Sequence, residues 1–108
     1  INITAENNNI DYLGHIKPYD KIILKYQVFV ESSITIEHYI KKDSDFQLIK
    51  NPYMPKNKTI KPGNIETLES FTIDTPGMQK FVFIDHEGKS SEFIFCVSTN
   101  ILNNKKCE

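Results

Sequence analysis

The residues of this sequence with the most chemical potential are its two cysteines and three histidines. Cys96 lies within the aromatic run "EFIFCV", where a thiol is more often a small buried apolar side chain than a nucleophile. His15, His38 and His86 lie in different segments and lack the spacing of a metal site. The serines of the turns have no recognisable base partner, and the four glycines form no phosphate-binding loop. The sequence therefore predicts no enzymatic activity, no metal site and no cofactor.

Two histidines have surroundings that favour structural roles. His38 falls in the apolar phase of an alternating run, which predicts a satisfied or edge-facing histidine rather than a ligand. His86 lies between Asp85 and Glu87, whose oxygens could in principle hold a cation. Because Gly88 follows them, we interpret this stretch as a solvated hairpin tip.

The two cysteines, Cys96 and Cys107, would close a short ring if they paired. A bridge over so short a loop is worth about 3 kcal/mol in the loop-entropy model, a large contribution for a domain of this size. We expect this disulfide, because the cysteine of the tail would otherwise be an exposed thiol. Two alternatives remain open: two free thiols, or a bridge from Cys107 to a neighbouring domain.

Two glycosylation sequons accompany the cysteines. Asn2-Ile3-Thr4 and Asn57-Lys58-Thr59 both match the acceptor pattern, although an asparagine-rich chain produces such matches by chance. Together with a disulfide they favour a protein of the secretory pathway, located outside the cell or at its surface.

The charge of the chain argues against nucleic acid as a partner. The net charge is −1, and all thirteen basic residues are lysines, so the bidentate fork of arginine is absent. No apolar run approaches the ~18 residues of a membrane span, so membrane attachment would require an anchor outside this sequence. Because the chain opens on Ile1, we expect a domain excised from a larger protein, with a protein partner or neighbouring domains of the same polypeptide as its contacts.

The hydrophobic pattern repeats every two residues along most of the chain. In "KIILKYQVFV" and "SITIEHYIKK", apolar and polar residues alternate as in strands with one buried side, and no window shows helical spacing. The short turn between these two runs predicts that they pair as an antiparallel hairpin. The pattern predicts a single all-β domain over residues 1–108, an antiparallel sandwich of about seven strands, at residues 10–16, 21–30, 33–42, 45–50, 66–74, 78–85 and 91–99.

The segment from Lys50 to Asn64 interrupts this pattern and is the candidate binding loop. It carries four lysines and no acidic residue, and its three prolines limit the entropy lost on ordering. The alternative is a long, solvated crossover between sheets, and a glycan on Asn57 would shield the loop. The candidate binding residues are Tyr53, Met54, Lys56, Lys58 and Lys61.

The closing stretch, "PGMQKFVFIDHEGKSSEFIFCV", joins a Pro-Gly turn, an aromatic strand, a glycine-containing hairpin and a final phenylalanine-rich strand. In this it resembles Ig-like modules such as filamin repeats, Golgi-dynamics (GOLD) domains, and the Ig-like domains of adhesion proteins and class II fusogens. The resemblance implies an Ig-like β-sandwich. It also implies a non-enzymatic interaction or structural module acting in adhesion, recognition or membrane fusion.

Two alternative functions follow from the same resemblance. One is a cargo-binding or protein-binding module of the GOLD type. The other is an Ig-like inhibitor of cysteine proteases, similar to the chagasin family. This chain departs from that family's motifs, because Asn51-Pro52 is followed by Tyr53-Met54 and the chain has no arginine.

Overall fold

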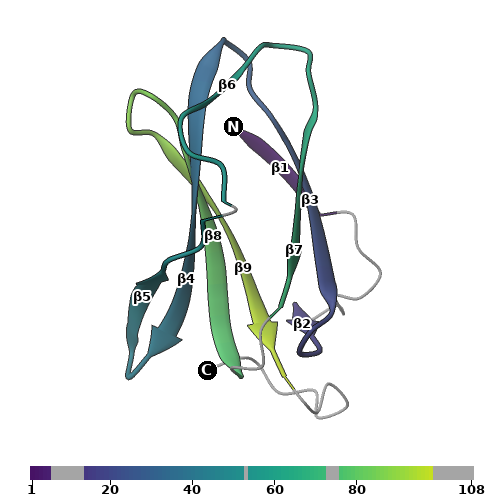
Figure 1. The fold of residues 1–108 in the computed structure, drawn as a ribbon, viewed down its shortest axis with the longest axis vertical. Coiled ribbons are helices and arrows are strands. Elements are labelled where there is room, and N and C mark those ends of the chain that lie inside the picture. Colours follow the sequence, from purple (N-terminus) through teal and green to yellow (C-terminus); the bar gives the residue numbers. More distant parts are fainter. Residues whose placement is uncertain (6–13, 53, 73–75, 99–108) are drawn as a thin grey trace.

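The computed structural model describes residues 1–5, 14–52, 54–72 and 76–98. Over these residues the chain is all-β and forms nine strands arranged in two facing sheets (Figure 1). The strands are β1 (Asn2–Ala5), β2 (His15–Ile16), β3 (Lys21–Gln27), β4 (Ser32–Lys42), β5 (Asp45–Ile49), β6 (Lys58–Ile60), β7 (Glu66–Phe71), β8 (Gly77–Ile84) and β9 (Ser90–Val97).

The two sheets differ in size and in strand order. The smaller sheet has the order β1-β3-β7, and its pairs are antiparallel. The larger sheet has the order β2-β9-β8-β4-β5, with β6 also paired to β4. Its pairs are antiparallel except for β2, which runs parallel to β9.

The alternation in the sequence is confirmed along the two central strands. Every second residue of β3 and β4 is buried, including Tyr26 and His38. Side chains of successive strand residues point to opposite faces, so each strand presents one apolar face to the space between the sheets.

The predicted hairpin between these two strands is wrong. β3 pairs with β1 and β7, whereas β4 pairs with β5, β6 and β8, so the turn at residues 28–31 crosses from one sheet to the other. Both strands have an apolar face, and packing those faces against each other across the sandwich removes both from water. In a two-stranded hairpin, the two apolar faces would instead lie on one side and need a further layer to cover them.

The expected number of about seven strands is also too low for the described residues. β1 was not expected, and β6 lies inside the segment that the prolines suggested was irregular. The free edge of β4 explains β6, because Ser32 and Ile34 pair there with Ile60 and Lys58. Between β5 and β6 the carbonyl of Pro55 accepts a hydrogen bond from the backbone N–H of Ile36. The far edge of β4 is therefore covered by β5, Pro55 and β6 in turn.

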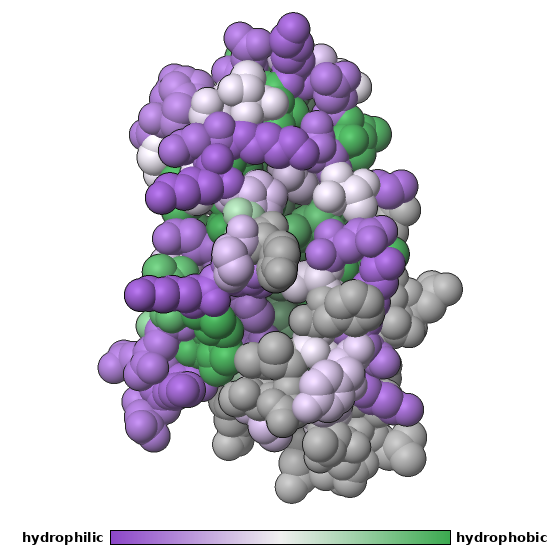
Figure 2. All heavy atoms as spheres, in the orientation of Figure 1, coloured by the Kyte–Doolittle hydropathy of each residue, from purple (hydrophilic) through white to green (hydrophobic). Residues whose placement is uncertain are grey.

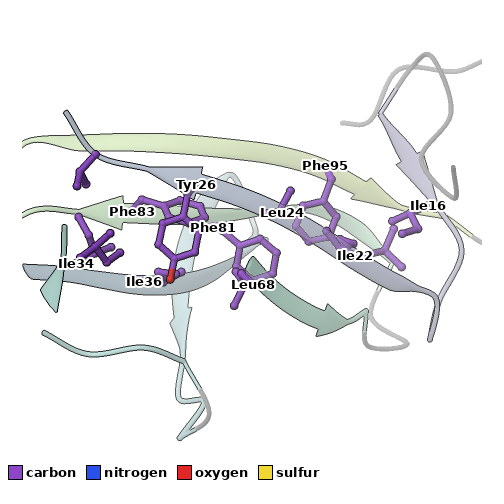
Figure 3. Packing of buried hydrophobic residues seen from close by; sticks show 13 residues of the cluster. Ile16, Ile22, Leu24, Tyr26, Ile34, Ile36, Leu68, Phe81, Phe83 and Phe95 are labelled. Carbon is purple, nitrogen blue, oxygen red and sulfur yellow. The ribbon is translucent and has the colours of Figure 1, made fainter. Parts of the chain in front are cut away.

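The core lies between β3 of the smaller sheet and β4, β8 and β9 of the larger (Figure 3). Aromatic rings form its centre: the centroids of Tyr26 and Phe83 are 5.1 Å apart, and those of Phe81 and Phe95 are 5.4 Å apart. Each fully buried side chain of this size stabilises the fold by about 1.5–3 kcal/mol. This contact between the sheets is the main source of stability in a domain that has no helix among its described residues.

One polar pair is buried in the aromatic core. The ring of His38 lies 4.7 Å from the ring of Phe81, and its Nε2 lies 2.8 Å from Oε1 of Gln79. Because an amide oxygen only accepts, Nε2 carries the proton and donates it. Burial lowers the pKa of His38, and the hydrogen bond to Gln79 opposes this shift only in part. Of the two placements expected for His38, satisfied or edge-facing, the structure has the satisfied one.

Acid should therefore weaken the fold through His38. Its pKa is lower in the folded chain than the ~6.5 of an unfolded histidine, so the unfolded state binds the proton more readily. The contribution of neutral His38 to the free energy of unfolding is complete above pH ~6.5. It is lost as the pH falls toward the lowered pKa of His38 in the folded chain, by up to about 1.4 kcal/mol per pH unit. Urea unfolding measured from pH 7.5 downward should show this slope in the wild type and a shallower one in His38→Gln. Parallel pH profiles for the two proteins would contradict the assignment.

Candidate functional site

Three connections meet at one end of the sandwich, which we call the loop end: residues 28–31, 61–65 and 85–89. Strand register places them together, because Tyr26 pairs with Glu66, Ser32 with Ile60, and Thr35 with Ile84. In Figure 1 the β3–β4 turn and the β6–β7 connection lie at the top, with the β8–β9 hairpin beside them.

The loop end gathers three of the four most exposed large hydrophobic side chains among the described residues; the fourth, Tyr19, lies at the opposite end of β3. Phe29 is 71% exposed, Val30 is 66% exposed and Ile65 is 63% exposed. None of the three turns requires such residues, because turns are built from glycine, proline and short polar side chains. Beside Ile65 is a shallow hollow lined by Asn2, Thr4, Lys25, Tyr26 and Gln27.

Hydrogen bonds fix the β8–β9 turn of the loop end. One carboxylate oxygen of Asp85 accepts from the backbone N–H groups of Glu87 and Lys89, each at 2.9 Å. Gly88 has a φ of 83°, a left-handed conformation that glycine adopts without strain. His86 and Glu87 are exposed at the tip, as expected for a solvated hairpin. Among the described residues, no three side chains of His, Cys, Asp or Glu gather as metal ligands.

An ion pair ties together the two strands that flank the β6–β7 connection. Nζ of Lys58 lies 2.9 Å from a carboxylate oxygen of Glu66, and this hydrogen bond raises the pKa of Lys58. Tyr26 is in register with Glu66 and interacts electrostatically with both members of the pair. Burial raises the pKa of its hydroxyl. An exposed pair of this kind contributes little to stability, about 0.2–1 kcal/mol.

The structure separates the residues of the predicted binding loop. Met54 is partly buried and packs against the core, while Lys58 is engaged with Glu66. Lys56 and Lys61 are exposed, and only Lys61 lies at the loop end. Tyr53 lies outside the described residues.

Much of this segment is fastened to β4. The backbone N–H of Asn57 donates to Oγ1 of Thr35 at 3.0 Å, and Ile60 is buried in the core. Residues 54–60 thus follow the edge of β4 within the larger sheet, and the chain crosses to the smaller sheet only at residues 61–65, so binding by this segment stays a prediction.

A second surface lies on the outer face of the larger sheet, and we call it the Lys80 face. Nζ of Lys80 lies 4.2 Å from the ring centroid of Phe46 and 5.3 Å from that of Tyr39. Leu48 on β5 is 54% exposed and Ile94 on β9 is 50% exposed. Figure 2 shows hydrophobic atoms at the surface at the lower left, where β5 lies in Figure 1.

The predicted modification sites are only partly described. Cys96 is buried on β9 and is not a free thiol, whereas Cys107 lies outside the described residues, so their pairing stays a prediction. Asn2 on β1 and Asn57 before β6 are both exposed, as an oligosaccharide acceptor must be.

Comparison with protein-family models and with curated proteins finds no match for this chain. The described residues contain no helix long and apolar enough to cross a membrane. The candidate function therefore depends on the geometry of the chain itself.

The apolar residues of the loop end were not predicted as a site, although the sequence contains one signal. Phe29 falls in the polar phase of the run from Lys21 to Val30, alongside Lys25 and Gln27. Val30 falls in the apolar phase of the same run, which predicts burial, but β3 ends at Gln27 and Val30 lies in the turn. Ile65 follows Pro62-Gly63-Asn64 and lacks an alternating context.

Substitutions in the 54–61 segment should separate its structural part from its exposed part. Ile60→Ala should lower the free energy of unfolding by about 2–4 kcal/mol, because it leaves a cavity in the core. Lys61→Ala, one residue away and exposed, should change it by less than about 0.5 kcal/mol. Urea denaturation of both variants measures this difference. Similar losses in both variants, or none in either, would contradict the description of the segment.

Proposed function

We propose that this chain is an Ig-like, non-enzymatic interaction module of a secreted or cell-surface protein, and that it contacts a protein partner or a neighbouring domain through its loop end. The observation that carries the proposal is the exposure of Phe29, Val30 and Ile65 at one end of a rigid sandwich.

The strand order supports the Ig-like assignment. In the immunoglobulin arrangement, one sheet contains strands A, B and E and the other contains G, F and C, with chain crossings between the sheets. β1, β3 and β7 occupy the first set of positions here, and β9, β8 and β4 the second. The crossing from β3 to β4 corresponds to the B–C connection of that arrangement.

Exposed apolar groups support the choice of the loop end. Single apolar residues at a surface are ordinary, but three large ones at one end, beside a hollow, favour a contact surface. Covering each of them in a complex would contribute about 1.5–3 kcal/mol. Because the connecting turns are short and the strands are packed, little conformational entropy would be lost on binding.

The charges of the loop end favour a protein partner over nucleic acid or an anionic membrane. Glu31 and Glu87 lie there with Lys61 and Lys89, and Lys89 is 3.7 Å from Glu87. Charges of both signs provide no field that would attract nucleic acid or an anionic membrane. The extracellular setting rests on the expected disulfide and on the exposed sequons at Asn2 and Asn57.

The loop end can be tested by changing its apolar residues together. Fluorescent tetramers of the chain, produced in a glycosylating host, should bind to cells, or to the extracellular matrix, of the organism from which the chain comes. The triple variant Phe29→Ser, Val30→Ser, Ile65→Ser should lose at least about tenfold in binding, since the lost contacts amount to more than 1.4 kcal/mol. Its melting temperature should stay close to that of the wild type, because the three side chains pack little in the free chain.

Tyr19→Asn provides the matched control. Tyr19 is 67% exposed but precedes β3, at the opposite end of that strand. Asparagine tolerates its positive φ of 66°. This variant should bind as the wild type does. Unchanged binding by the triple variant, or no binding by the wild type, would contradict the proposed function.

A further inference from the structure

The Lys80 face presents a continuous row of side chains across four strands of the larger sheet. Tyr39 on β4 is in register with Leu48 on β5 and with Lys80 on β8, and Lys80 is in register with Ile94 on β9. The two ends of this row, Leu48 and Ile94, are half exposed. The row lies on strands rather than loops, so its side chains keep fixed positions.

Contacts within the face hold its central side chains in place. Lys80 lies over the ring of Phe46 and donates a hydrogen bond to Glu92 at 3.3 Å. The hydroxyl of Tyr39 donates to Glu37 at 3.1 Å. Side chains already held in this way lose little entropy when a partner covers them.

Charge is distributed unevenly along the strands of this face. One row closer to the loop end, the outward-facing residues are Glu37, Val82 and Glu92. Register places these three side by side on β4, β8 and β9. The central row contains Lys80, and beyond it Lys41 is in register with Phe46. Two carboxylates therefore lie on the loop-end side of Lys80, with Lys50 beside Glu37 just after β5, and Lys41 lies on the other side.

From this distribution we propose that the Lys80 face binds a second copy of the same chain, related by a two-fold axis that runs across the strands between the Lys80 row and the Glu37–Glu92 row. This axis reverses the strand direction of the partner and places each Lys80 between Glu37 and Glu92 of the other copy. It also places Tyr39 opposite Glu37 of the other copy, and Ile94 opposite the side chain of Glu92. A two-fold axis makes every such contact twice.

The alternative two-fold axis, along the strands, is disfavoured by the same charges. It would place the row of Glu37 and Glu92 of one copy opposite the same row of the other copy. It would also place the row of Lys80 opposite the same row of the other copy. Like charges placed opposite each other across an interface cost several kcal/mol. Within a dimer of this chain, the distribution of charge therefore favours the axis across the strands, and this interface lies on a different surface from the loop end.

The size of the face indicates a weak, reversible dimer. The outermost positions of the face, on four strands and in three rows, lie roughly 14 Å apart in each direction, from the spacing of strands and of alternate residues. That is smaller than the interfaces of permanent dimers. We expect dissociation in the micromolar range and weakening by salt, because the contacts include exposed charges.

Sedimentation velocity over a concentration series, from about 5 µM to about 1 mM, brackets the expected affinity. The wild type should pass from monomer to dimer over this range. Ile94→Glu, which changes a half-exposed side chain and faces an acidic residue of the other copy, should remain monomeric with an unchanged melting temperature. A wild type that stays monomeric throughout, or an Ile94→Glu variant that dimerises like the wild type, would overturn the proposal.

A charge-exchange pair tests the orientation. Lys80→Glu alone and the double variant Glu37→Lys, Glu92→Lys alone should each remain monomeric, because each brings like charges together. An equimolar mixture of the two should associate, because every contact between unlike copies then joins opposite charges. Because the Lys80 side chain is only 17% exposed and lies over the ring of Phe46, Lys80→Glu also costs stability within each chain, and melting temperatures show whether each variant is folded under the conditions of the assay. A mixture that stays monomeric would exclude this axis.

The loop-end triple variant separates this inference from the proposed function. Phe29→Ser, Val30→Ser, Ile65→Ser should dimerise like the wild type even though it no longer binds a partner. Dimerisation that disappears with the triple variant and persists in Ile94→Glu would place the interface at the loop end and overturn the assignment of the Lys80 face.

Discussion

The packing of β3 against β4 across the sandwich is the constraint on which the rest of the structure depends. Both strands carry an apolar face, and each covers the other, so the turn between them must cross from one sheet to the other. That crossing places Phe29 and Val30 at the end of the molecule. The other face of β4, with Glu37 and Tyr39, then lies on the outside of the larger sheet. Both candidate surfaces thus result from one burial requirement.

His38 and Gln79 are the polar exception inside this apolar contact. A hydrogen-bonded pair among aromatic rings costs some desolvation, and only one arrangement of the two strands satisfies both side chains. The pair therefore favours a single register between β4 and β8, in which Ile40 pairs with Gln79 and His38 with Phe81. An apolar pair at these positions would tolerate a slipped register more easily.

Much of the fold could be predicted from the sequence, because alternation is a local property of a strand. The runs that became β4, β5, β8 and β9 were predicted within two residues of their observed limits, whereas β3 was predicted three residues too long. Strand partners were harder to predict: alternation shows that β3 and β4 each have a buried side but does not show what covers it. β6 was missed because three residues between Pro55 and Pro62 carry too short a pattern, and only the edge of β4 explains their pairing. The exposure of Val30 depended on where β3 ends, which alternation alone does not determine.

The covering of the far edge of β4 has a consequence for the behaviour of the chain in concentrated solution. An exposed edge of a long, apolar strand is a template on which other chains can add strands and aggregate. β4 is the longest described strand, and β5, Pro55 and β6 occupy its outer edge in succession. The proline-rich segment that first suggested recognition thus protects the domain against polymerisation.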